Sequence, residues 1–243
     1  MSVEPRATTS LRPPAVLRRA LAIVRRHGAR VVGGALACLV APAVVTAVLA
    51  ELFLGSELRV LVAVPVGIVM TAVSAGGVVV FAGYLDLIVH TDRLGRDPAA
   101  LTEVVPRLPI WRLLAANAVL FALFGIGSAF FLVPGLVVLT WFSLVGSMIV
   151  TGGATSLWDG FARSRRVVRG HFWLVLLMVT VPLVLEHDIV LIAEHAIDGR
   201  SDVVAVVAAV VIILLVNISV ALVEVVLAED LREGALGVAA KGE

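Results

Sequence analysis

The chain has 243 residues, of which 60% are hydrophobic and 15% charged, and its mean hydropathy is +1.09. Soluble globular domains are about 45–50% apolar and about 25% charged, so this composition excludes that class. The single cysteine, Cys38, excludes a disulfide scaffold, and the high hydrophobicity excludes a disordered chain. The class that remains is an all-α polytopic membrane protein, a bundle of transmembrane helices.

Residues 1–30 are predicted to be a cytoplasmic tail that contains a basic amphipathic helix. Arg18, Arg19, Arg25 and Arg26 are spaced so that they share one helical face beside apolar residues. Such a helix lies in the membrane interface, with its apolar side toward the acyl chains and its arginines among anionic headgroups. The alternative interpretation is that these arginines only fix the topology.

Stretches without Asp, Glu, Lys or Arg predict the membrane spans. A helix needs about 20 apolar residues to cross the hydrocarbon core, so the charge-free stretch 113–158 is long enough for two spans. Pro134-Gly135 lies near its middle, which predicts a tight helical hairpin there, and Pro42, Pro65 and Pro182 should kink their helices. The chain therefore predicts six helices in a domain covering 31–228, at about 31–54, 60–88, 113–133, 136–152, 171–193 and 203–228, followed by a cytoplasmic tail at 229–243.

The positive charges predict the orientation. With six spans both termini lie on one side, and all Lys and Arg residues except Arg59 and Arg200 fall on that side. Short loops rich in Lys and Arg stay in the cytoplasm. We therefore expect a multi-pass protein of a prokaryotic cell membrane with both termini in the cytoplasm.

A second basic amphipathic stretch occupies residues 158–169. Arg163, Arg166 and Arg169 recur there at every third position, which makes them candidates for a second contact with anionic lipid. From the charges alone, a solvated interfacial turn is the favoured interpretation.

Two segments carry a family resemblance. Residues 131–136, with Pro134-Gly135, and residues 161–173, with Arg163-Ser164, Gly170 and Trp173, resemble a prokaryotic membrane protein family. That family is related to the membrane domain attached to some glycerophosphoryl diester phosphodiesterases. The resemblance implies six helices, a Pro-Gly between the third and fourth, and a cytoplasmic Arg-Ser segment that leads into the fifth. The family's Pro and Glu late in the fourth helix are missing at 147–152, and the phosphodiesterase domain is not expected, so no hydrolase activity is implied.

Polar groups inside the predicted spans are candidates for function. They are Asn217 near the middle of the last span, Glu224 toward its cytoplasmic end, Asp86 in the second span and Asn117 in the third. A transport path needs such groups to converge at mid-depth, whereas hydrogen bonds between helices need only pairs. Packing is the favoured interpretation.

The predicted external loop is acidic and contains the weak metal-ligand candidates His187, His195 and Asp198. Imidazole with carboxylate suits Zn²⁺, but the spacing is poor, and a solvated loop is the simpler interpretation. We expect no metal and no cofactor.

These observations favour a non-enzymatic integral membrane protein that engages anionic lipid, or a membrane protein partner, from the cytoplasmic face. The alternative is a small transporter or channel lined by polar residues of the second, third and sixth spans. A third possibility is a metal-dependent enzyme on the outer face. The expected partners are membrane lipids, and no nucleic acid.

Overall fold

The computed structural model of the chain describes residues 13–54, 59–130, 132–183, 185 and 203–239. Helices joined by turns and short irregular connections make up this described part, and no strand occurs in it. It contains five helices that are long and apolar enough to cross a membrane, or up to six if one bent pair counts as a span. The protein is therefore an all-α polytopic bundle, as predicted.

The basic N-terminal helix and the first span are continuous. Helix α1 (Pro13–Ala35) runs into a π-helical segment, Leu36–Val40, and then into α2 (Ala41–Leu54). His27 alone has non-helical dihedrals inside α1, with φ −121° and ψ 20°, so the helix changes direction there. The predicted boundary near residue 30 is this kink and not a loop.

Some apolar side chains of α1 pack inside the protein, and others are exposed on its surface. Val16, Ala20 and Ile23 recur at helical spacing, are at most 6% exposed, and pack against α3 and α11. Leu17 and Leu21, one residue further round, are 51% and 52% exposed. The expectation that the apolar side as a whole faces acyl chains is therefore wrong, because one half of it belongs to the core.

Two of the three span prolines follow π-helical segments. Pro42 comes after Leu36–Val40, and Pro182 comes after Leu176–Thr180. A proline lacks the N–H and crowds the carbonyl four residues before it, and a wider turn accommodates both effects. Helix α3, by contrast, continues across Pro65.

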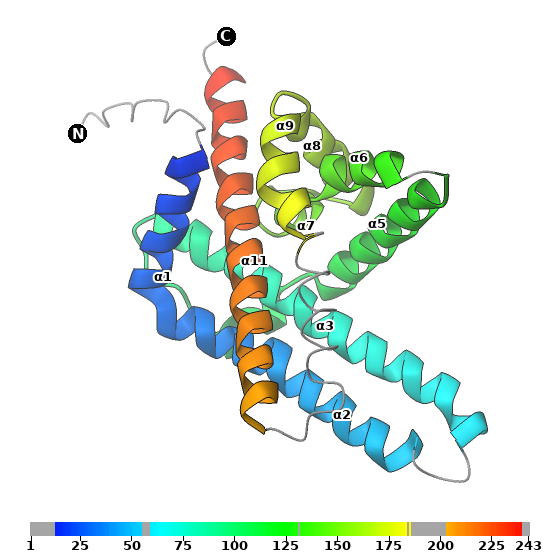
Figure 1. Ribbon diagram of the computed structural model, residues 1–243. Helices are drawn as coiled ribbons and strands as arrows, with labels where there is room; N and C mark the ends of the chain where they lie inside the picture. Colours follow the sequence, from blue (N-terminus) through cyan, green and yellow to red (C-terminus); the bar gives the residue numbers. More distant parts are fainter. Residues whose placement is uncertain (1–12, 55–58, 131, 184, 186–202, 240–243) are drawn as a thin grey trace.

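Two long helices lie at the centre of the bundle. They are α3 (Arg59–Arg93) and α11 (Val203–Ala239). Figure 1 shows α11 between α1 and the group formed by α5 to α9, while α2 and α3 extend together away from that group. Helix α11 continues well past residue 228, so the segment expected as the tail begins as helix. The side chains of Leu85, Ile88, Leu227 and Leu231 are at most 2% exposed where these helices pack.

The predicted hairpin is present, but its second helix begins at Leu132, so Pro134-Gly135 lie inside that helix and not between the two. A short connection of α4 (Leu101–Val104) and the 3₁₀ turn Val105–Arg107 leads into α5 (Ile110–Phe130), and α6 (Leu132–Phe142) packs closely against α5. Pro134 lies in the first turn of α6, where a missing N–H costs no intrahelical bond. Gly127 and Gly135 allow the close approach, since a Cβ on Gly127 would lie 2.9 Å from the Gly135 Cα.

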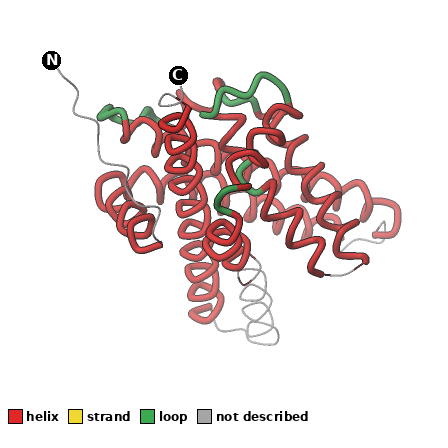
Figure 2. Tube along the Cα trace, turned by 90° about the horizontal axis from the view of Figure 1, so that it is seen from above, coloured by secondary structure: helices red, strands yellow, loops and turns green. Residues whose placement is uncertain are grey.

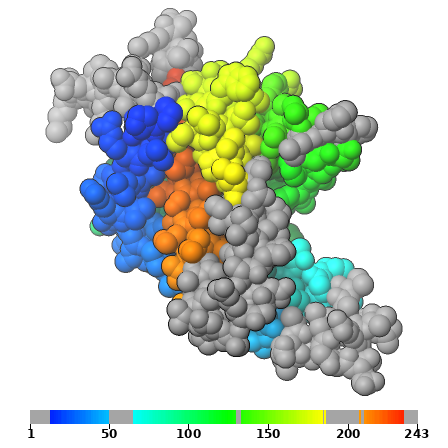
Figure 3. Space-filling view, in the orientation of Figure 1, coloured from blue at the N-terminus to red at the C-terminus, as the bar shows by residue number. Residues whose placement is uncertain are grey.

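The fourth predicted span is broken, and the fifth begins just after a sharp bend. The fourth divides into α6 and α7 (Val145–Val150). The described part of the fifth span ends at residue 185, and it consists of α9 (Phe172–Val175) and the helical residues that follow it. Helix α8 (Leu157–Arg169) comes before α9, and the chain bends by 103° between α8 and the helix that starts with α9. Figure 2 shows the helices from above, and Figure 3 shows α11 flanked by α1 and by residues of the α8–α9 region.

Candidate functional site

Charged residues from three helices meet at the end of the bundle where α1 begins and α3 and α11 end. We call this group the ion cluster, and its members are Arg19, His90, Arg93, Glu229, Asp230, Arg232 and Glu233. Three guanidinium groups face three carboxylates, so the charges balance. That balance is what a partly buried polar group requires, because an unpaired buried charge is strongly unfavourable.

Glu229 is the central acceptor of the cluster and only 4% exposed. Its Oε1 lies 2.6 Å from Arg232 Nη2, 3.0 Å from His90 Nδ1 and 3.9 Å from Arg93 Nη1. The buried carboxylate is therefore shared between α3 and α11.

Asp230 and Arg232 connect α11 to the rest of the bundle. Asp230 pairs with Arg19 of α1 and lies 3.5 Å from Arg93 Nη1. Arg232 donates to the carbonyl of Thr151, just after α7 ends, and so satisfies a carbonyl that has no intrahelical partner. The cluster thus joins α1, α3, α7 and α11.

A second connection joins α1 to α3. Oδ1 of Asp92 lies 2.9 Å from Arg26 Nη1 and 2.9 Å from His27 Nε2. The Asp92 and His27 side chains are 13% and 12% exposed, whereas Arg26 is 61% exposed. The nearly buried pair of Asp92 and His27 therefore lies directly at the kink of α1.

The four N-terminal arginines are divided between two roles. Arg19 and Arg26 face carboxylates of the bundle, whereas Arg18 and Arg25 are exposed and form no ion pair among the described residues. The prediction that all four share one face is wrong, because successive residues on a helix are rotated by about 100°. The outward-facing pair is next to Leu17 and Leu21.

Helix α8 shows the same division. Arg163 Nε lies 3.0 Å from Asp159 Oδ1, and its Nη1 donates to the carbonyl of Gly152 at 2.7 Å. Arg166 and Arg169 are exposed, and no ion pair of theirs occurs within the described ranges. Trp158 in the first turn of α8 and Trp173 in α9 are 68% and 77% exposed.

The start of α8 is capped. Ser156 Oγ accepts from the Asp159 N–H at 3.1 Å, and Asp159 Oδ2 accepts from the Thr155 N–H at 3.0 Å. The hydrogen bond from Arg163, with that from Thr155, holds the pKa of Asp159 below its ordinary value of 3.8. Asp159 is therefore ionised at neutral pH.

The motif that carries the family resemblance has local structural roles. Ser164 is fully buried, and its Oγ donates to the Trp141 carbonyl at 3.0 Å, next to the break between α6 and α7. Arg165 lies over the Trp141 ring, 4.5 Å from its centroid. These contacts attach α8 to α6, the first half of the fourth span.

The intramembrane polar candidates lie in three different helices, α3, α5 and α11. Asn117 and Asn217 each donate to a carbonyl of their own helix, those of Leu113 at 3.2 Å and Ile213 at 3.1 Å. Asp86 is 4% exposed and hydrogen-bonds Ser147 of α7, next to the ion cluster. Glu224 is half-buried on α11.

The weak metal candidates His187, His195 and Asp198 lie outside the described residues. Among the residues that the structure describes, no group of three or more His, Cys, Asp and Glu side chains could hold a metal ion.

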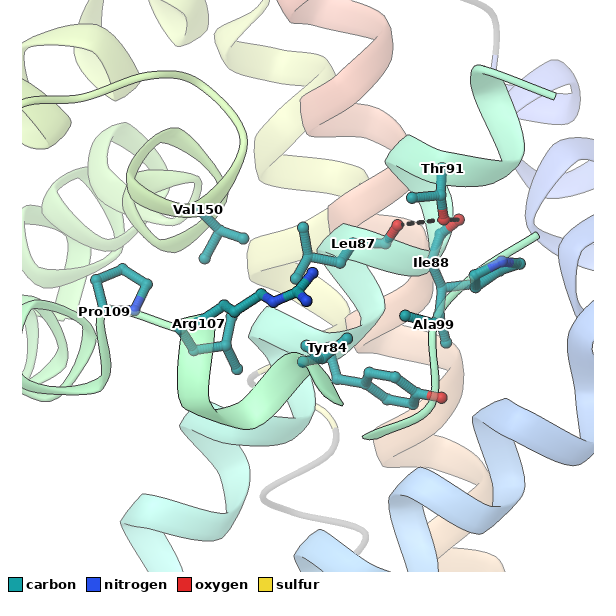
Figure 4. A pocket seen from close by; sticks show the side chains of 11 residues that line it. Tyr84, Leu87, Ile88, Thr91, Ala99, Arg107, Pro109 and Val150 are labelled. Atoms are coloured by element: carbon teal, nitrogen blue, oxygen red, sulfur yellow. Dashed lines mark hydrogen bonds between the residues drawn. The ribbon is translucent and has the colours of Figure 1, made fainter. Parts of the chain in front are cut away.

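A cavity of about 210 Å³ lies between the last turns of α3 and the connection to α5. Its walls are residues of α3 from Tyr84 to Thr91, Pro98 and Ala99, the turn from Val104 to Pro109, and Val150 of α7. In Figure 4 the Arg107 side chain extends across it toward Leu87. The walls are mostly apolar, and Arg107 is their one cationic residue.

Sequence reasoning missed the ion cluster almost completely. His90 and Arg93 follow the second span directly, and Glu229 and Asp230 follow the charge-poor part of the last one. Opposite charges at the same end of two spans are a signal that could have identified the pairing. Comparison with family models, with curated proteins and with solved structures finds no match to this chain.

Proposed function

We propose that the protein is a non-enzymatic integral membrane protein that engages anionic lipid from its cytoplasmic face. The observation that carries the proposal is that four of the arginines predicted to contact lipid face outward and make no ion pair within the described residues. They are Arg18, Arg25, Arg166 and Arg169.

Exposed apolar side chains accompany these arginines. Leu17 and Leu21 lie beside Arg18 and Arg25, and Trp158 and Trp173 lie at the two ends of the α8 region. Cationic heads next to apolar and indole groups are typical of a surface at the level of lipid headgroups. Arg19, Arg26 and Arg163 leave the proposed lipid-contacting set, because they face carboxylates of the protein.

The proposed location is a prokaryotic cell membrane with both termini in the cytoplasm. The sidedness of Lys and Arg supports it. The resemblance to the six-helix family related to the phosphodiesterase membrane domain is part of the same proposal. A reporter enzyme fused after Glu243 and active only outside the cytoplasm tests the orientation, and activity of that fusion would contradict it.

The lipid proposal is tested by reconstitution. Full-length protein in phosphatidylcholine vesicles with a minor fraction of phosphatidylglycerol is extracted gently, and its retained lipids are identified by native mass spectrometry. Replacing the four outward-facing arginines by Gln should abolish the enrichment of phosphatidylglycerol, while Lys at the same four positions should preserve it. Unchanged enrichment in the Gln variant would remove the assignment.

A buried polar network favours a second candidate, a small transporter or channel. Asp86 and Glu229 are both 4% exposed, and His90 and Arg232 lie between α3 and α11 beside Glu229. Buried ionisable residues on membrane helices mark ion and proton paths in other proteins. Proteoliposome proton or cation flux that is lost in Asp86→Asn, but not in the four-arginine variant, would establish this function instead.

A further inference from the structure

The cavity beside α3 combines an apolar wall with a single cationic group. Leu87 and Ile88 of α3 form one side of it, and Val104 and Leu108 of the connection form the other. The guanidinium of Arg107 extends across the space between them (Figure 4). A ligand that fits this arrangement has an apolar part and an anionic part in direct succession.

Arg107 has no ion-pair or hydrogen-bond partner among the residues that the structure describes. The side chain is exposed, and no carboxylate or hydrogen-bond acceptor in the described part of the chain pairs with it. This distinguishes Arg107 from Arg93 and Arg232, whose charges are matched inside the ion cluster. A charge that is unmatched over an apolar wall attracts an anion.

The position of the cavity favours a membrane lipid over a soluble anion. It adjoins the start of α5, a candidate span, where Trp111 is 84% exposed. Trp is enriched at the headgroup level of membranes. A free phosphate ion would gain nothing from the apolar wall, whereas the glycerol end of a phospholipid places a phosphate and acyl chains side by side.

The volume limits how much of the lipid enters. At about 210 Å³ the cavity is smaller than pockets that enclose a drug-sized molecule, which hold about 300–1,000 Å³. We propose that the cavity holds the glycerol-phosphate end of one anionic phospholipid, with its phosphate on Arg107 and the first part of an acyl chain against Leu87, Val104 and Leu108. The rest of the lipid stays in the surrounding bilayer. This inference rests on the proposed function, for which it names a specific site.

The experiment uses the full chain in phosphatidylcholine vesicles that contain a phosphatidylglycerol probe with a photoactivatable group near the carboxyl end of one acyl chain. After irradiation, labelled peptides are mapped by mass spectrometry. We expect labelling within residues 84–91 and 98–109. Arg107→Gln should reduce it about tenfold, the effect of losing one charge-assisted hydrogen bond.

Two further variants sharpen the test. Ala99→Phe places a large side chain in the cavity and should reduce labelling as strongly as Arg107→Gln. Arg112→Gln is the matched control, because Arg112 is also exposed but does not line the cavity, and its labelling should equal that of the native protein. If the Ala99→Phe protein fails to fold, the labelling of Arg107→Gln alone tests the site. We expect Arg107→Gln to fold, because Arg107 makes no ion pair or hydrogen bond within the described residues.

The outcomes separate this site from the wider proposal. Labelling that prefers phosphatidylglycerol but maps only to α1 and α8, and is unchanged by Arg107→Gln, overturns the cavity and leaves the proposed function standing. Equal labelling by phosphatidylglycerol and phosphatidylcholine probes overturns both. Loss of labelling on adding millimolar inorganic phosphate would identify a soluble-anion site and overturn the assignment to lipid.

Discussion

The Nε2 atom of His27 and the Oδ1 atom of Asp92 lie 2.9 Å apart, and they join the kink of α1 to the last turn of α3. Both side chains are nearly buried. The interaction therefore fixes the direction in which the N-terminal half of α1 leaves the first span.

Replacing Asp92 by Asn should loosen this connection. The amide cannot match the charge of Arg26, so the free energy of unfolding should fall by about 1–3 kcal/mol. Thermal denaturation in detergent measures the change. Asp97→Asn is the control, because Asp97 is exposed and has no ion pair among the described residues. Equal destabilisation by the two substitutions would show that the Asp92 contacts do not hold α1.

Glu229→Gln should be the most damaging change within the ion cluster. It leaves the Arg232 and Arg93 charges facing a neutral group in a nearly buried place, which costs about 3–5 kcal/mol when one partner of a buried pair is lost. Glu233, 48% exposed, also faces Arg93, and Glu233→Gln should cost at most about 1 kcal/mol. Denaturant unfolding of both variants compares them. Similar losses would mean that the cluster is solvated throughout.

Gly77 and Gly76 offer a matched pair on α3. A Cβ at Gly77 would lie 1.9 Å from the carbonyl oxygen of Cys38, in the π-helical segment, whereas a Cβ at Gly76 would meet nothing within 4 Å. Gly77→Ala should therefore separate α3 from the first span and destabilise the protein by about 1–3 kcal/mol or more. Gly76→Ala should be neutral or slightly stabilising. The melting temperatures of the two variants test this contrast. Equal melting temperatures would show that α3 and the first span are not in contact at Gly77.

Ser164→Ala should weaken the attachment of α8. It removes the donor to the Trp141 carbonyl in a fully buried place, and an unsatisfied carbonyl costs about 1–3 kcal/mol. Ser219 is exposed and bonds a carbonyl of its own helix at 2.7 Å, so Ser219→Ala should change stability little. Limited proteolysis and Tm report the difference. A Ser164→Ala protein as stable as the Ser219→Ala protein would contradict the role assigned to this bond.

The start of α8 should lose order in acid. Because the folded-state pKa of Asp159 lies below the unfolded value, its contribution is complete above the unfolded value and is lost as pH falls through the folded one. Amide exchange of residues 155–163, followed from about pH 6 to about pH 3, should show faster exchange at the acidic end. Asp159→Asn should remove that dependence, and a dependence that persists in this variant would assign it to another group.

The fold was largely predictable, and the site was not. Charge-free stretches located the helices because each apolar run has to be long enough to cross the bilayer, and Pro134-Gly135 marked a real hairpin. Counting charges could not tell which arginines face the protein. Arg18 and Arg19 are adjacent in sequence and equally basic, and only the position of Asp230, more than two hundred residues away, separates their roles.

The break in the fourth span and the bend before the fifth were also beyond the sequence pattern. Hydropathy reports the length of an apolar run and is insensitive to a turn at 143–144 or to the angle between α8 and α9. The positions of Ser164 and Arg163 are explained only by the backbone carbonyls to which they donate, that of Trp141 at the break in the fourth span and that of Gly152 after α7.

The length of α11 has a consequence for the bilayer around the protein. Its 37 residues rise to about 55 Å, well beyond a hydrocarbon core of about 30 Å. The charge of Glu233, which is 48% exposed, cannot be drawn into that core without losing its hydration, so it limits where the boundary of the core crosses the helix. A thicker or thinner membrane must therefore be accommodated by tilt, or at the Val203 end, and hydrophobic mismatch acts on one end of this helix only.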